Sequence, residues 1–87
     1  MSDEPKITYP CDYPIKVVGE AHVTFQATVF EIASRHDTTL TEDRVTLRES
    51  KAGNFLSVTL ILTAESEEQI QALFAELNAL EFVRLVL

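Results

Sequence analysis

The chain has 87 residues, 46% hydrophobic and 24% charged, a balance typical of one small folded domain rather than a disordered segment. Its formal net charge of −7 disfavours non-specific binding to nucleic acid or to an anionic membrane. No apolar run approaches the roughly 18 residues of a membrane span, and the polar residues 1–6 do not resemble a signal peptide. Cys11 is the only cysteine and excludes an internal disulfide, so the composition predicts a cytoplasmic protein.

The first half of the chain predicts an arm, a strand and a helix. Residues 1–14 are polar and contain all 3 prolines, which predicts an irregular N-terminal arm before a single domain at residues 15–87. Residues 15–20 are rich in β-branched side chains and predict a first strand. Residues 22–36 predict a helix, because buried-type side chains recur at helical spacing, at Phe25, Val29, Ile32 and His36.

The middle of the chain predicts a β-hairpin. Residues 44–48 alternate between apolar and polar side chains, and residues 55–63 show the clearest alternation in the sequence. Between them, Gly53 and Asn54 suit the backbone conformations of a tight turn. Two alternating runs joined by a short loop that contains glycine are typical of a hairpin.

The last third predicts a second helix and a final strand. Ser66 and Gln69 have the spacing of a capping box, so a helix is expected to start there and to run to about residue 80. Residues 82–87 then predict a last strand. The resulting β-α-β-β-α-β order predicts an α+β ferredoxin-like sandwich, in which a four-stranded antiparallel sheet has both helices on one face.

Several segments resemble a known family. The chain reads DYPIKVVG at residues 12–19, SKAGNFLSVTLILTA at residues 50–64, SEEQIQALFAEL at residues 66–77 and VRLVL at residues 83–87. These segments are similar to those of the YbeD-like (UPF0250) family of small bacterial proteins. The resemblance spans roughly residues 9–87 and implies a cytoplasmic, ferredoxin-like domain shaped like the ACT regulatory domains. It transfers no catalytic residue, because none is established for that family.

The residues themselves predict no catalytic site, no cofactor and no metal. His22 and His36 are the only histidines, and no further ligands stand at the spacing of a metal site. The 2 glycines are too few for a phosphate-binding loop of the P-loop or dinucleotide type. We therefore expect a protein that is not an enzyme.

The face of the sheet opposite the helices is the candidate interaction surface. Strand alternation assigns four of the 7 basic residues to this face, together with apolar side chains: Lys16, Val18, Arg44, Arg48, Phe55, Ile61, Arg84 and Val86. One interpretation is an interface, because apolar patches on a monomer usually have a role. The alternative is an ordinary surface, on which the basic residues pair with Glu20 and Glu49.

Three functional hypotheses follow, and the first two are preferred. The domain is a module for protein interaction or oligomerisation, with an unknown protein partner, and a homodimer is expected by analogy with ACT domains. Or it senses a small-molecule effector as ACT-like domains do, at the loop of Gly19 and His22, where a helix begins. The last is a single-stranded RNA-binding platform on the open sheet face with Phe55 as the stacking base, which the negative net charge disfavours.

Overall fold

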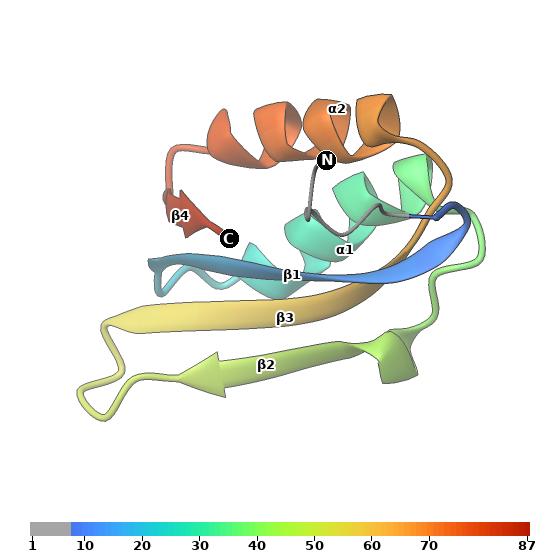
Figure 1. The fold of residues 1–87 in the computed structure, drawn as a ribbon. Helices are drawn as coiled ribbons and strands as arrows, with labels where there is room; N and C mark the ends of the chain where they lie inside the picture. Colours follow the sequence, from blue (N-terminus) through green and yellow to red (C-terminus); the bar gives the residue numbers. More distant parts are fainter. Residues whose placement is uncertain (1–7) are drawn as a thin grey trace, which may run out of the picture.

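The computed structural model describes residues 8–87 and has two layers, a four-stranded antiparallel sheet and two helices (Figure 1). The strands are β1 (Cys11–Glu20), β2 (Val45–Glu49), β3 (Phe55–Ala64) and β4 (Val83–Val86), and they lie in the order β2-β3-β1-β4. The helices α1 (Phe25–His36) and α2 (Glu67–Asn78) lie together on one face of the sheet. The predicted ferredoxin-like fold is confirmed.

The core lies between the sheet and the two helices. Alternate side chains of β1 and β3 point into it and are fully or almost fully buried, among them Ile15, Val17, Val58 and Leu60. The helices close the core with one apolar stripe each, which follows the predicted helical period: Phe25, Val29, Ile32 and Ala33 from α1, and Ile70, Leu73 and Leu77 from α2. The remaining sheet face carries the opposite set of side chains, and neither α1 nor α2 covers it.

The first strand starts earlier than predicted. Cys11–Pro14 were expected in an irregular arm, but they pair with Ile61–Ala64 of β3 as part of β1. Pro14 fits there because Lys16, two residues on, directs its backbone N–H to Leu87 at the end of the chain. The nitrogen of Pro14 therefore points to the β4 side of β1, beyond Leu87, where no backbone group of residues 8–87 is paired with it. A proline at this position costs no hydrogen bond of the sheet. Residues 1–7 of the predicted arm lie outside the described residues.

The prediction for Val86 is wrong. β4 pairs Val86 with the buried Val17, and Val86 packs against the core instead of facing outward. The register between β1 and β4 shifts at Val18 and Gly19, where Gly19 pairs with Val83 and Val18 with Leu85. Arg84 lies between these two pairs and has no partner residue on β1. This extra residue in β4 interrupts the alternation of inward and outward side chains. Leu85 takes the outward position that the simple alternation assigns to Val86.

Helix boundaries follow local capping. Ser66 caps α2 as predicted, because its hydroxyl accepts a hydrogen bond from the Gln69 N–H at 3.2 Å. α1 begins at Phe25, three residues later than predicted, with Thr24 at the N-cap position. A 3₁₀ turn at Glu42–Arg44 precedes β2, so the second strand starts one residue later than the sequence indicates.

Candidate functional site

The open sheet face has a floor of short side chains between long cationic ones. Ser57 and Thr59 stand at the centre of this face on β3. Thr59 pairs with Lys16 of β1 on one side and with Thr46 of β2 on the other, and Ser57 pairs with Arg48 of β2. Paired residues of neighbouring strands point to the same face of a sheet, so Lys16 and Arg48 rise on opposite sides of the two hydroxyl groups.

This arrangement produces two adjoining hollows. The more polar hollow has a volume of about 340 Å³ and is lined by Lys16, Thr46, Arg48, Ser57 and Thr59. The second has a volume of about 290 Å³ and extends toward the β2–β3 turn; its lining comprises Lys16, Val18, Arg48, Glu49, Ser50, Phe55, Leu56 and Ser57. Lys16, Arg48 and Ser57 belong to both, so one group of side chains connects a polar region with an apolar one.

Two of the four basic residues expected on this face are held by acidic partners. Arg44 lies 2.8 Å from Asp12 and donates a hydrogen bond to the Thr63 hydroxyl at 3.0 Å. The hydrogen bond to Asp12 raises the pKa of Arg44, so its guanidinium group stays charged. Arg84 donates to Glu20 at 2.6 Å, the cross-strand pair that the alternative interpretation expects. Glu49 forms no such pair among the described residues.

Lys16 and Arg48 differ from these two. Within residues 8–87, neither takes part in an ion pair or a side-chain hydrogen bond. Both are exposed and both line the two hollows. They are therefore the cations of this face that are available to a ligand.

Apolar groups border the same region. Phe55 is 47% exposed at one end of the hollows, which is unusual for a phenylalanine. Val18 lines the second hollow. Leu85 of β4, also 47% exposed, pairs with Val18. Ile61 lies farther along β3, opposite Pro14, and borders neither hollow.

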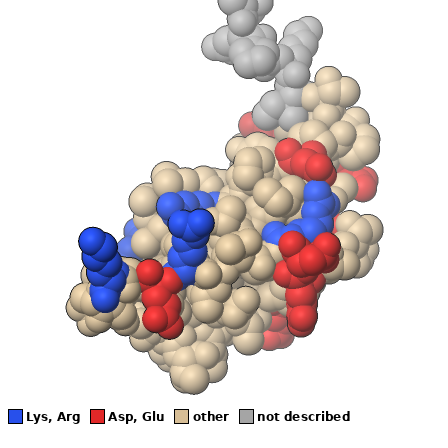
Figure 2. Space-filling model, turned by 90° about the horizontal axis from the view of Figure 1, so that it is seen from below, with Lys and Arg blue, Asp and Glu red and all other residues tan. Residues whose placement is uncertain are grey.

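Charges on this side do not form a continuous positive field. Figure 2 views the molecule from below the sheet of Figure 1 and shows basic side chains toward both ends, next to acidic ones, with uncharged surface between them. A nucleic-acid surface would need cations along the path of the phosphates. The mixed pattern instead favours a ligand with one or a few localised negative charges.

The loop of Gly19 and His22 is engaged within the chain. Gly19 is buried, and a side chain there would collide with the Phe82 carbonyl oxygen and come within 2.7 Å of the Phe25 ring. The His22 ring stacks on Phe82 with centroids 5.0 Å apart, and its Nδ1 accepts a hydrogen bond from the Thr24 N–H at 3.2 Å. His22 thus satisfies an amide at the start of α1.

A second polar cluster lies where α1 ends against β3. Asp37 is the buried charged residue of the described core, and its carboxylate accepts hydrogen bonds from the Thr39 and Thr63 N–H groups at 2.9 Å each. Burial on its own would raise the pKa of Asp37, but the bonds from Thr39 and Thr63, aided by the charge of Arg44, outweigh it and lower the pKa.

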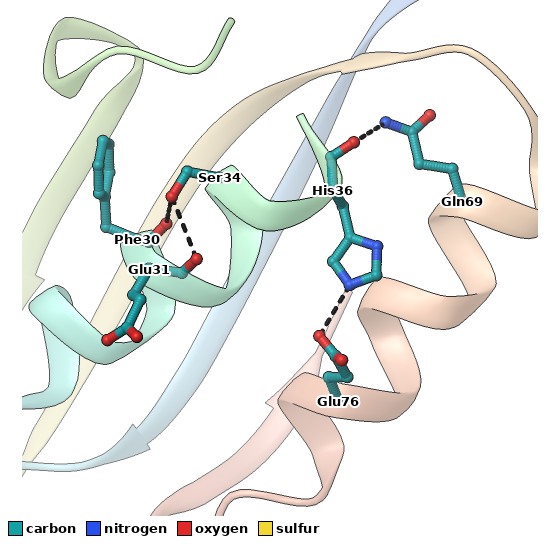
Figure 3. A network of polar contacts seen from close by, with 6 residues as sticks. All are labelled: Phe30, Glu31, Ser34, His36, Gln69 and Glu76. Atoms are coloured by element: carbon teal, nitrogen blue, oxygen red, sulfur yellow. Dashed lines mark hydrogen bonds and ion pairs between the residues drawn. The ribbon is translucent and has the colours of Figure 1, made fainter. Parts of the chain in front are cut away.

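Gln69 and His36 join the two helices at the same end (Figure 3). The Gln69 amide donates to the His36 carbonyl at 2.6 Å and to the Thr63 carbonyl at 3.3 Å, and it accepts from the Glu65 N–H at 2.5 Å. The His36 ring lies 2.7 Å from Glu76, and this hydrogen bond lowers the pKa of Glu76. Gln69 and His36 border a shallow hollow of about 280 Å³, and within residues 8–87 no buried side-chain polar atom lacks a hydrogen-bond partner. The contacts of this cluster join α1, β3 and α2.

Other features of the described residues do not suggest a reaction. A groove of about 530 Å³ lies between α1 and the start of β2 and is lined by Gln26, Ala27, Phe30, Glu42 and Val45, without a cation. Within residues 8–87, no three side chains of His, Cys, Asp or Glu gather as metal ligands would. None of the helices in that part of the chain is long and apolar enough to span a membrane.

The sequence predicted only some of the residues that line or border the two hollows. Alternation on β3 already placed Ser57 and Thr59 on the open face, but only the strand register shows that they lie between Lys16 and Arg48. Leu85 was missed because the irregularity in β4 is not visible in the sequence. Asp37 and Gln69 gave no signal of their long-range contacts, since their partners are 26 and 33 positions away in the chain.

The fold and this face define a small α+β domain of ferredoxin-like order whose sheet has one uncovered side. The chain belongs to the DUF493 family, described as "Protein of unknown function (DUF493)", whose model matches residues 4–87. A UPF0250 protein of Ectopseudomonas mendocina is 45% identical over 84 residues, covering 95% of this chain and 91% of the relative. A UPF0250 protein of Leptothrix cholodnii is 45% identical over 92 residues, covering both chains completely. The predicted family resemblance is confirmed.

Solved structures agree on the fold. Protein HP0495 from H. pylori superposes with a TM-score of 0.80 at 22% identity, covering 99% of this chain and 90% of that one. The ACT domain of GTP pyrophosphokinase from Chlorobium tepidum superposes with a TM-score of 0.69 at 18% identity, covering 88% and 97%. At these identities the likeness establishes the ACT-like fold, and function has to be argued from this chain's own surface.

Proposed function

We propose that this protein is a non-enzymatic interaction module that regulates another protein by binding it through the open sheet face. The observation that carries the proposal is the combination of exposed apolar groups and free cations around the two hollows, with Phe55, Lys16 and Arg48 at their rim. An exposed apolar region rimmed by polar groups is typical of a protein-binding surface. Cytoplasmic location stays a prediction from the sequence and the family resemblance.

Charge argues for a different protein as the partner rather than a second copy on the same face. A two-fold dimer that joined two open faces would bring Lys16 and Arg48 of both copies into one interface. Like charges placed opposite each other oppose association, and no free acidic residue of the polar hollow offsets them. A partner that brings negative charge meets no such repulsion.

Small-molecule sensing at the Gly19 and His22 loop stays a prediction, as does RNA binding. Both residues of that loop make contacts within the chain, and two of the four arginine and lysine residues expected to meet phosphates have acidic partners. Neither alternative is favoured by a specific observation.

Affinity capture from the cell of origin with two variants tests the proposal. We expect partners that bind the wild-type protein to be lost with the double variant Phe55→Ser and Leu85→Ser. The matched control is Val23→Ser, which alters a valine that is 97% exposed near the start of α1. If the same proteins are captured by all three forms, or none by the wild type, the open face is not the interaction surface.

A further inference from the structure

The polar hollow has the composition of a carboxylate-binding site. Two cations, Lys16 and Arg48, flank three hydroxyl groups, those of Thr46, Ser57 and Thr59. β3 separates the strands that carry the cations, and Lys16 is level with Thr59 whereas Arg48 is level with Ser57. Two strand spacings and an offset of two residues therefore separate their backbones, about 12 Å in all. Long side chains reaching inward from both sides can hold one anionic group between them, above hydroxyl groups that can donate to its oxygens.

The apolar hollow continues directly from this site. Phe55 lies on the same strand and the same face as Ser57, one side-chain repeat of about 7 Å away. A ligand that fills both hollows therefore needs a negative charge and, at about that distance, an apolar group. In an extended peptide, the side chains of residues i and i+2 satisfy this requirement.

We propose that the open face recognises an extended protein segment in which an acidic residue and an apolar residue stand two positions apart. This inference rests on the proposed function and specifies the chemistry of its partner. The carboxylate lies between Lys16 and Arg48, and the apolar side chain contacts Phe55 and Val18. Charge complementarity selects this occupant, because the polar hollow contains both cations and no acidic residue, and neither cation has an acidic partner within residues 8–87.

The two cations of the polar hollow allow a test by substitution. Glu49 also borders the apolar hollow, but it pairs with the buried Leu56, so its side chain points to the helix side of the sheet. Lys16→Gln and Arg48→Gln should therefore weaken binding, whereas Glu49→Gln should leave it almost unchanged.

The experiment is a titration of the isotope-labelled full chain, followed by NMR, with three blocked pentapeptides. The first has the sequence Phe-Ser-Glu-Ser-Glu, the second has glutamine in place of both glutamates, and the third has serine in place of phenylalanine. We expect the first peptide to shift the amide signals of Ser57 and Thr59. We expect the second to bind about threefold to tenfold more weakly, the range for an exposed or partly buried charge-assisted contact. The third should also bind more weakly, because it loses the apolar contact.

Variants locate the binding. Lys16→Gln and Arg48→Gln should each weaken binding of the first peptide about threefold to tenfold, and Glu49→Gln should leave it almost unchanged. Arg35→Gln is the matched control, because Arg35 is exposed on α1, in the layer that covers the other face, and its loss changes the net charge equally. Melting temperatures of all variants confirm that each one folds.

The alternatives give different results. Equal binding of the glutamate and glutamine peptides, or an equal loss in Arg35→Gln, would overturn the carboxylate site. Shifts produced only by inorganic phosphate or by a single-stranded oligonucleotide would also overturn it, in favour of a phosphate ligand. If capture on the open face succeeds but these peptides fail, the proposed function stands and this inference about the partner's chemistry falls.

Discussion

The carboxylate of Asp37 accepts a hydrogen bond from the backbone N–H of Thr63 at 2.9 Å, and this contact fastens the end of α1 to the end of β3. The other carboxylate oxygen accepts from Thr39, so the same side chain also shapes the turn that follows the helix. Arg44 reaches the same place from the 3₁₀ turn before β2 through the Thr63 hydroxyl. One buried acidic group thereby joins the end of α1 to a strand residue 26 positions farther along the chain.

Asp37→Asn should destabilise the fold by about 1–3 kcal/mol. Asparagine has one oxygen, but both carboxylate oxygens of Asp37 accept from N–H groups, so the amide nitrogen would face a donor and leave one buried N–H without an acceptor. Urea unfolding measures the change. Asp43→Asn is the control, because Asp43 is exposed in the 3₁₀ turn, and an equal loss in both variants would contradict a specific role for Asp37.

The contribution of Asp37 should disappear in acid. Folding lowers its pKa from the ordinary 3.8, so the ionised form stabilises the folded state fully above that value. As pH falls through the lowered pKa of the folded state, the stabilisation is lost. The difference in unfolding free energy between wild type and Asp37→Asn should therefore shrink from about pH 5 to about pH 2. A difference that stays constant with pH would show that Asp37 is not ionised in the fold.

Gln69→Glu should destabilise the protein by about 1–3 kcal/mol, although glutamate is a standard capping-box residue. The Gln69 amide donates to the carbonyls of His36 and Thr63, and a carboxylate would place negative charge against both oxygens. Glu68→Gln, one position earlier on the exposed side of α2, serves as the control in the same thermal unfolding series. A neutral or stabilising Gln69→Glu would mean that only the capping role matters.

Gly19→Ala should be among the most damaging single substitutions, at the upper end of about 1–3 kcal/mol or beyond. The added methyl group meets the Phe82 carbonyl oxygen and the Phe25 ring, and neither can move without disturbing the core. Gly53→Ala is the informative comparison. It has free space around it, but its φ of +73° costs about 1 kcal/mol, so a smaller loss is expected there. Chemical denaturation of both variants decides between collision and backbone strain.

The sequence by itself determined the elements and their order, because side-chain periodicity reports directly which face of a strand or helix is buried. The alternation from Phe55 onward and the capping pair of Ser66 and Gln69 predicted β3 and the start of α2 correctly. Boundaries were less accurate where tertiary contacts override local pattern. Pro14 is accommodated in β1 only because its nitrogen faces the unpaired side of that strand.

Only the tertiary structure decided which side chains of the open face are available. Arg44, Arg84, Lys16 and Arg48 look alike in the sequence, but strand register brings acidic partners to the first two and hydroxyl groups between the last two. The irregularity in β4 likewise places Leu85, and not Val86, on the open face. Pairing between strands depends on residues far apart in the chain, and local periodicity carries no information about such partners.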